Sequence, residues 1–260
     1  MIRGMFSAAT GMNAQQLAVD TIAHNLSNVN TVGFKKFRAD FQDLLYQKMR
    51  PAGAENVAGS EIPSGIEVGL GVKPQSISKI MTQGTLITTE NPLDVAIEGD
   101  GFLQVSLPDG TTAYTRDGSI KLDSTGQFVN SDGLIFQPSI TVPAESVSLT
   151  IGQDGTVTSL DGSGTATNLG QLQLANFTNP IGLTNLGKNL YQETVASGTP
   201  TVGNPGDAGL GTLSQGFLEL SNIQLVEELV NLILAQRAYE VNSRVIKTAD
   251  EMLRTATNIR

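Results

Sequence analysis

Apolar positions recur at helical spacing at the two ends of the chain, in residues 5–26 and 221–259. The N-terminal stripe consists of Met5, Ala8, Met12, Gln15, Val19, Ile22 and Leu26. The C-terminal stripe consists of Leu225, Leu229, Leu232, Gln236, Tyr239, Ser243, Ile246, Ala249 and Leu253. Alternating spacings of three and four predict a coiled-coil seam. Because such a stripe must be buried, we expect the two helices to pair with each other and with further copies of the chain.

The C-terminal helix carries a second apolar set, away from the first stripe. Its members are Val226, Val230, Ile233, Leu234, Val241 and Val245. One short partner helix cannot cover both sets, so the pattern favours a multi-chain bundle. Ser221 followed by Gln224 predicts a capping box that starts this helix. A helix from there to about residue 257 would be roughly 50 Å long.

The region between the helices has a different pattern. An asparagine-rich stretch ends the first helix, because Asn and Gly accept left-handed backbone angles. Residues 41–46 predict a short helix or an extended segment, and residues 50–74 predict a loop with short strands near 65–72. Farther on, Asp-Gly occurs six times, beginning at Asp100, Asp109, Asp117, Asp132, Asp154 and Asp161. Asp-Gly between apolar segments predicts hairpins, and hence a small barrel or sandwich of antiparallel strands.

These patterns together predict an α+β fold in which paired N- and C-terminal coiled-coil helices flank a β-rich middle domain. We divide the chain into residues 1–45 and 212–260, the two halves of a helical core domain, and residues 46–75, a linker or insertion. Residues 76–211 form the β-rich middle region, with a compact β domain at about 93–190.

Charge and composition narrow the function classes. The 260 residues include 25 acidic and 16 basic side chains, a formal charge of −9, which argues against a nucleic-acid binder. There is no cysteine, so disulfides, thiolate metal sites and cysteine nucleophiles are excluded. No stretch approaches the roughly 18 to 20 apolar residues that span a bilayer, so we expect no membrane insertion. The N-terminus lacks the apolar run of a cleaved signal peptide.

Candidate catalytic chemistry is scarce. His24 is the sole histidine, and no nucleophile and acid stand near it in a triad pattern, so a polar helix position or a packing contact is expected. The Asp-Gly pairs lack the spacing of a calcium loop, and no phosphate-binding glycine loop is present. Lys35, Lys36 and Arg38 form a small basic cluster, which we interpret as a solvated face or an intersubunit contact. We therefore expect no catalysis, metal or cofactor.

Three separated motifs resemble one family. Residues 22–35 are similar to the asparagine-rich signature of the bacterial flagellar rod and hook axial proteins, with family-motif residues Asn25, Asn28, Asn30, Gly33 and Phe34. His24 departs from that signature, which more often has asparagine there. Residues 228–230 and 236–243 resemble the C-terminal signature, and residues 94–102 and 114–118 resemble the middle domain. The resemblance extends over most of the chain, because the motifs lie at both ends and in the middle.

Within the family, the length and residues 44–74 look most like a subunit of the distal rod. The resemblance implies a homo-oligomeric helical tube with an axial channel, whose inner core is the terminal helices. It further implies export through the flagellar type III apparatus without cleavage, and a straight drive shaft that crosses the periplasm toward the hook. Implied partners are proximal rod and hook-side axial proteins, and surrounding ring proteins. Residues 50–74 resemble a stiffening insertion, in which Ile66, Val68, Leu70 and Val72 would latch onto a neighbouring subunit.

Two alternatives stay open at this point. One is a proximal rod subunit of the same family, which differs in whether residues 50–74 form an intersubunit hairpin. The other is a secreted β-rich enzyme or carbohydrate-binding module with helical stalks. A glycan site needs clustered aromatics or a carboxylate pair, and the chain has no Trp and 4 Tyr.

Overall fold

A computed structural model describes residues 2–51, 64–207 and 209–258 of the chain. They divide into two compact units. The helical unit comprises the described residues of 2–27, 37–78 and 224–258, and the β unit comprises those of 28–36 and 79–223. The predicted α+β class, with terminal helices flanking a β-rich middle, is confirmed.

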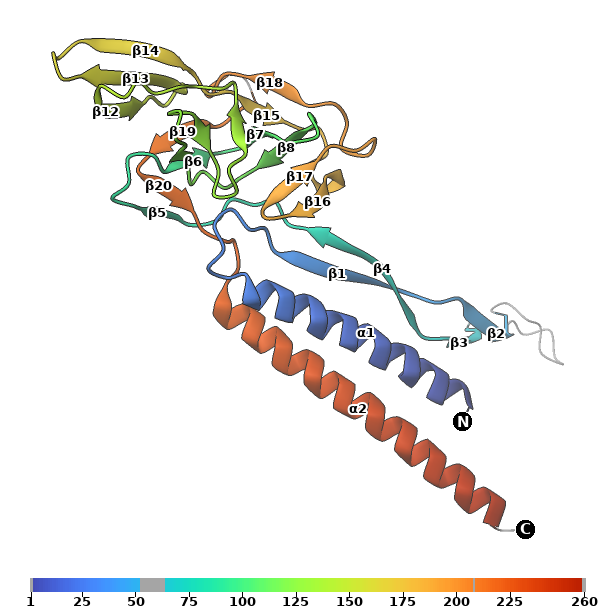
Figure 1. The fold of residues 1–260 in the computed structure, drawn as a ribbon. Helices are drawn as coiled ribbons and strands as arrows, with labels where there is room; N and C mark the ends of the chain where they lie inside the picture. Colours follow the sequence, from blue (N-terminus) through green and yellow to red (C-terminus); the bar gives the residue numbers. More distant parts are fainter. Residues whose placement is uncertain (1, 52–63, 208, 259–260) are drawn as a thin grey trace. The chain divides into compact units, whose positions relative to one another are not determined.

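The helical unit is built on two long helices, α1 (Ile2–Ser27) and α2 (Leu225–Asn258). They lie side by side and antiparallel, with the chain ends at the same end of the pair (Figure 1). Both predicted helices are therefore present. The predicted capping box is wrong: α2 begins at Leu225, four residues after Ser221, and its first turn is closed by Glu228 N donating to Gln224 O at 3.0 Å. No helix in the described part of the chain is long and apolar enough to cross a membrane.

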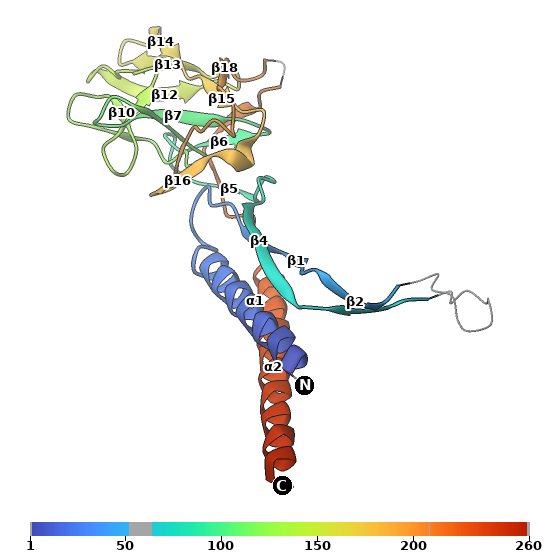
Figure 2. The ribbon, with the colours of Figure 1, turned by 90° about the vertical axis from the view of Figure 1, so that its right-hand side faces the viewer.

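A long two-stranded ribbon completes the helical unit. β1 (Phe37–Asp43) pairs with β4 (Val72–Lys79), and β2 (Tyr46–Arg50) pairs antiparallel with β3 (Ile66–Gly69) (Figure 2). Residues 41–43 and 46 are therefore extended, one of the two conformations expected there. Gly71 joins β3 to β4 with φ +114°, and a Cβ at this position would collide with Thr10 Oγ1 of α1. The predicted insertion therefore continues the ribbon, and its residues 52–63 lie outside the described residues.

The β unit contains sixteen short strands and one turn of 3-10 helix at Pro180–Gly182. The strands are β5 (Leu86–Thr88), β6 (Val95–Glu98), β7 (Phe102–Ser106), β8 (Thr112–Thr115), β9 (Lys121–Leu122), β10 (Phe128–Val129), β11 (Ile135–Gln137), β12 (Ser146–Ile151), β13 (Thr156–Asp161), β14 (Ala166–Gln171), β15 (Leu174–Asn176), β16 (Thr184–Gly187), β17 (Leu190–Gln192), β18 (Thr201–Gly203), β19 (Thr212–Gln215) and β20 (Phe217–Glu219).

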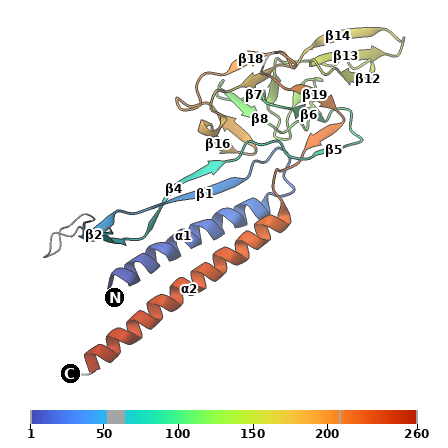
Figure 3. The ribbon, with the colours of Figure 1, turned by 180° about the vertical axis from the view of Figure 1, so that it is seen from behind.

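Most of these strands join one nine-stranded sheet of order β16-β17-β8-β7-β11-β10-β9, with β15 pairing to both β7 and β18. The order is an open path and not a closed barrel, since β16 and β9 are not paired. β12, β13 and β14 form a separate sheet beside β6 and β19 (Figure 3). β6 pairs with β19, and β5 pairs with β20.

The core of the β unit is apolar and fully enclosed. Its main cluster includes Val105, Phe128, Phe136, Val157 and Leu213, each at most 1% exposed. A second cluster holds the aromatic rings of Phe102, Tyr114, Phe177 and Tyr191, which meet edge to face. Because Leu213 lies on β19, the buried core extends past residues 93–190.

Four of the six Asp-Gly pairs lie in turns between paired strands, as predicted. They are at Asp109, Asp132, Asp154 and Asp161. The hairpin prediction is wrong at Asp100 and Asp117, because β6 and β7 belong to different sheets and β8 does not pair with β9. In the β7–β8 turn the Asp109 carboxylate accepts hydrogen bonds from the backbone N and Oγ1 of Thr111, so it stabilises the turn from within.

Candidate functional site

Most of the exposed large apolar side chains of the helical unit lie on α2. Its exposed side chains are Leu225, Val226, Leu229, Val230, Ile233, Leu234, Tyr239, Val241, Val245 and Met252. Val226 and Leu234 are 74% and 62% exposed. So many exposed apolar side chains on one helix point to an interaction surface, since single exposed apolar residues need no explanation but clustered ones do. We call it the α2 apolar face; its chemistry suits burial against another helix.

The contact between α1 and α2 uses only part of the two predicted stripes. On α2 the buried residues are Glu228, Ala235 and Ala249, and on α1 they are Ala8, Ala14, Thr21 and Asn25. Gly11 belongs to the same contact, since a Cβ there would lie 2.9 Å from Asn242 Nδ2. Small residues let the helices approach closely at these positions, and large apolar side chains of α2 such as Val226 and Leu234 stay exposed beside the contact.

The predicted coiled-coil stripes therefore overlap the intrachain contact, to which they contribute the buried Ala8 and Ala249. Leu225, Leu229 and Tyr239 are 47%, 41% and 43% exposed. The other large apolar members are half-buried: Leu232, Ile246 and Leu253 on α2, and Met5, Met12, Val19, Ile22 and Leu26 on α1. The single chain leaves much of the stripe accessible, and its burial between subunits stays a prediction.

Two shallow grooves follow the helix pair. One, of about 410 Å³, is lined by Gly4 of α1 and by α2 residues that include Val241, Val245 and Met252. The other, of about 440 Å³, lies between Val19 and Gln16 of α1 and Tyr239 of α2. The grooves border the α2 apolar face, since Val241, Val245 and Met252 line one of them and Tyr239 the other.

Asn25, a family-motif residue, fixes the end of α1 from within the helical unit. Its Nδ2 donates to Phe37 O at 2.8 Å and to Glu228 Oε2 at 3.4 Å, and its Oδ1 accepts from Phe37 N at 2.8 Å. The side chain is 1% exposed. One amide thus joins α1 to both β1 and α2. His24 beside it is an exposed packing residue, as expected, with its ring 5.4 Å from that of Phe37.

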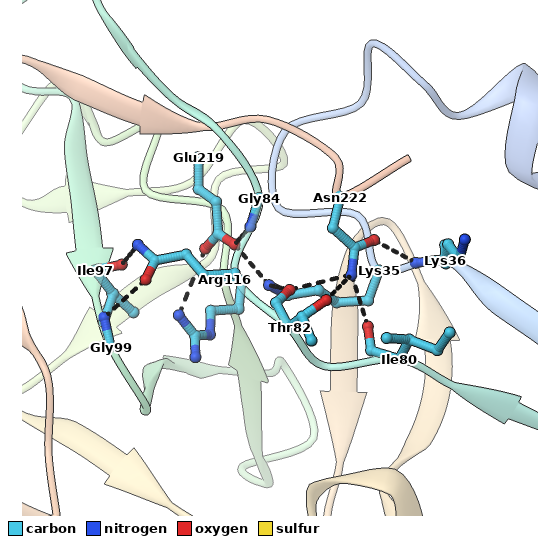
Figure 4. Close-up of polar contacts among 11 residues, drawn as sticks. Lys35, Lys36, Ile80, Thr82, Gly84, Ile97, Gly99, Arg116, Glu219 and Asn222 are labelled. Carbon is cyan, nitrogen blue, oxygen red and sulfur yellow. Dashed lines mark hydrogen bonds and ion pairs between the residues drawn. The ribbon is translucent and has the colours of Figure 1, made fainter. Parts of the chain in front are cut away.

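The interpretation of Lys35, in the basic cluster, as part of a solvated face or intersubunit contact is wrong. Lys35 is 1% exposed, and its Nζ lies 2.6 Å from Glu219 Oε1, which is equally buried (Figure 4). Nζ also donates to Thr82 O at 2.9 Å. Lys36 is half-buried and Arg38 is exposed, paired with Asp40 at 2.8 Å. Adjacent charges in sequence therefore have opposite environments, since the chain turns inward at Lys35.

Arg116 is the second buried cation of this network. Its NH1 lies 3.4 Å from Glu219 Oε2, its guanidinium stacks 5.2 Å from the ring centre of Phe102, and it is 4% exposed. Burial lowers the pKa of Lys35 and of Arg116, and the Glu219 carboxylate opposes that shift at both. Glu219 is the carboxylate that pairs directly with both cations, and the charge of Asp100 also favours their charged forms, so both cations depend most on Glu219.

Asn222 extends the network to the backbone. Its Oδ1 accepts from Lys36 N at 2.8 Å, and its Nδ2 donates to Ile80 O at 2.8 Å and to Thr82 O at 3.1 Å (Figure 4). Sequence reasoning missed Glu219, Arg116 and Asn222. A charged residue inside the apolar run 217–220 was the available signal, but its partners are more than one hundred residues away.

The other motif residues shape the turn after α1. Gly33 has φ +67°, and its Cα faces the backbone of Arg116, where a Cβ would lie 2.8 Å from the carbonyl carbon. Asn28 accepts from Thr31 at both its backbone and side-chain oxygens, Asn30 is exposed, and Phe34 is half-buried.

Of the proposed latch residues, Ile66 is exposed, and Val68, Leu70 and Val72 are half-buried. Within the described ranges, no group of three or more His, Asp or Glu residues could hold a metal ion.

Comparison with known proteins matches three segments of the chain. Residues 5–35 match the family described as "Flagella basal body rod protein", residues 96–159 the "Flagellar hook protein FlgE/F/G D1 domain", and residues 214–259 the "Flagellar basal body rod FlgEFG protein C-terminal". Proteins named "Flagellar basal-body rod protein FlgG" are 48% identical in Buchnera aphidicola, over 100% of both chains, and 49% identical in Borreliella burgdorferi, over 100% of this chain and 99% of the relative. The chain belongs to the flagellar basal-body rod protein family. A Bacillus subtilis rod protein of the same name is 39% identical over 100% of both chains.

The three matched segments of this rod-family chain meet in the buried network. Lys35 lies in the first segment, Arg116 in the second and Glu219 in the third. The similarity therefore covers α1, most of the β core and α2.

Proposed function

We propose that this chain is a structural subunit of the distal rod of the bacterial flagellum, where copies assemble into a straight helical tube. The tube transmits torque from the motor to the hook and encloses an axial export channel. The α2 apolar face carries the proposal, because the fully buried contact with α1 consists of small and polar residues and large apolar side chains such as Val226 and Leu234 stay exposed. Full-length similarity to basal-body rod proteins supports the assignment to the rod.

The proposal includes a location and partners. The subunit would leave the cell through the flagellar type III export apparatus without cleavage and would occupy the part of the rod that crosses the periplasm. Proximal rod proteins and hook-side axial proteins would bind at its two ends, and ring proteins would surround it. Its role would be mechanical, with no catalytic step.

Assembly is tested with Leu229→Asp in α2. Leu229 is 41% exposed in the single chain, so we expect the variant to fold normally. In the tube its charge would be buried without a partner, at a cost of about 3 kcal/mol or more per contact, which would abolish filaments. Asn13→Asp, at an exposed polar position of α1, is the matched control and should assemble. Electron microscopy of the concentrated proteins is the measurement. Straight filaments of Leu229→Asp would contradict the proposal.

The ribbon of β1 to β4 is proposed to stiffen the tube by latching one subunit onto the next through Ile66, Val68, Leu70 and Val72. Exposed Ile66 and the ladder of β2 with β3 support this, since a paired ribbon is stiffer than a free loop. Deleting residues 52–62, which lie outside the described residues, should preserve export and yield more curved rods in images of isolated hook–basal bodies. Equally straight rods would assign stiffness to the helices alone.

A further inference from the structure

Three segments of the β unit lead the chain to and from the helical unit. They are residues 28–36, between α1 and β1; residues 79–85, after β4; and residues 219–223, before α2. Backbone hydrogen bonds join them pairwise: Gly33 N donates to Glu219 O at 2.8 Å, and Leu220 N donates to Thr85 O at 2.9 Å. Ile80 N donates to Lys36 O at 2.9 Å. Wherever the chain crosses from one unit to the other, the crossing point lies at an end of one of these segments.

Two side chains of the last segment bind both of the others. The Glu219 carboxylate binds Lys35 of the first segment and accepts from Gly84 N of the second at 2.8 Å (Figure 4). The Asn222 amide accepts from Lys36 N and donates to Ile80 O and Thr82 O. Each of these side chains alone spans all three segments.

Packing in this region leaves no room for the segments to slide. A Cβ on Gly84 would collide with Leu220 O, and one on Gly33 would meet the backbone at residues 116 and 117. Glu219 is shared between Lys35 and Arg116, and Arg116 Nε is buried with no acceptor among the described residues. In such a buried polar cluster each group depends on the others, because removing one leaves the rest unpaired in a low dielectric.

We infer that Lys35, Glu219 and Asn222 form one polar tie, in which they act as positioning residues that hold the three segments as a single body. Force that enters along any one segment is then shared among all three. The source of that force rests on the proposed function; the tie itself is a property of the single chain. A cooperative tie differs from three independent contacts in one measurable way, since loosening one contact must loosen the others.

Residue-resolved amide exchange on the purified full chain tests the tie. The reporters are Gly84 N, which is bonded to Glu219, and Lys36 N, which is bonded to Asn222. In Glu219→Gln we expect exchange at both amides to rise about tenfold or more, with the same pair rising in Asn222→Ala. The amides of Val105 and Phe136, in the core, should be unchanged. Glu98→Gln, which neutralises an exposed carboxylate bonded to Ser214 Oγ at 2.8 Å, is the matched control.

Two results would overturn the inference. A rise confined to Gly84 in Glu219→Gln and to Lys36 in Asn222→Ala would mean independent contacts. A rise that includes the core amides equally would mean that these residues only maintain the global fold. If Glu219→Gln does not fold, Lys35→Met serves instead, because Arg116 still pairs with Glu219 there; both reporters should rise, by less.

Force sharing is tested in cells with Asn222→Ala. We expect a normal number of basal bodies and a swimming speed that falls more steeply than wild type as medium viscosity increases. Unchanged speed at high viscosity, with exchange at the reporters raised, would refute force sharing. Absence of filaments from the wild-type chain would instead contradict the proposed function, and the exchange result on the soluble chain would still decide on the tie.

Discussion

Two residues of the segment after α1 have unusual environments: Gly33 has a positive φ, and Lys35 has a buried charge. Gly33 combines a positive φ with backbone contact, and the residue two places later, Lys35, turns its ammonium inward to Glu219. A side chain at Gly33 would push the chain away from Arg116 and so displace the segment that carries Lys35. Glycine is therefore required at position 33 both because the Arg116 backbone lies too close for a side chain and because φ is positive.

Gly33→Ala should destabilise the β unit by about 3 kcal/mol or more, since the cost of a left-handed alanine adds to the overlap with the Arg116 backbone. Gly110→Ala is the matched control: Gly110 has φ +82° but nothing within 4 Å of its Cβ position, so only about 1 kcal/mol should be lost. Urea unfolding followed by tyrosine fluorescence measures both, because the chain has no Trp. Equal losses in the two variants would show that packing at Gly33 is unimportant.

At the scale of elements, polar side chains set the ends of helices and strands. Asn25 links α1, β1 and α2 by hydrogen bonds that need both an amide donor and a carbonyl acceptor. The buried apolar residues of the α1–α2 contact are alanines, which supply little apolar area. The buried Asn25 amide therefore fixes the junction of three elements of the helical unit.

Asn25→Asp should loosen the junction of α1 with β1. The new carboxylate oxygen would face Phe37 O and Glu228 Oε2, which leaves two acceptors against each other at a cost of about 2 to 4 kcal/mol. We expect faster exchange at the Phe37 amide and a lower helical melting temperature by circular dichroism. Asn13→Asp, exposed on the same helix, should change neither. A normal Phe37 amide in Asn25→Asp would refute this role.

At the scale of the whole chain, burial is uneven. The β unit encloses a core of large side chains such as Phe128, Phe136 and Leu213, whereas the buried apolar residues of the helices are alanines. Stability from burial grows with the apolar area removed from water, so the helices of a single chain gain little from it.

Amide exchange on the verified monomer should therefore be fast in residues 8–26 and 225–253 and slow in the β core. Assembly would add the missing burial, so the same helical amides should become protected in filaments. Equally slow exchange in helices and core of the monomer would contradict this account of where the stability lies.

The sequence by itself determined the two terminal helices, the β-rich middle and four of the six Asp-Gly turns, because each follows from local spacing and turn chemistry. It also showed that α2 has more apolar side chains than one partner helix can cover. Only the tertiary structure decided which stripe of α2 meets α1, since close approach at Gly11 and Ala235 outweighs apolar content when the large side chains can remain accessible. Only the tertiary structure placed Lys35 inside, because Glu219 and Arg116 come from segments that local patterns cannot bring together.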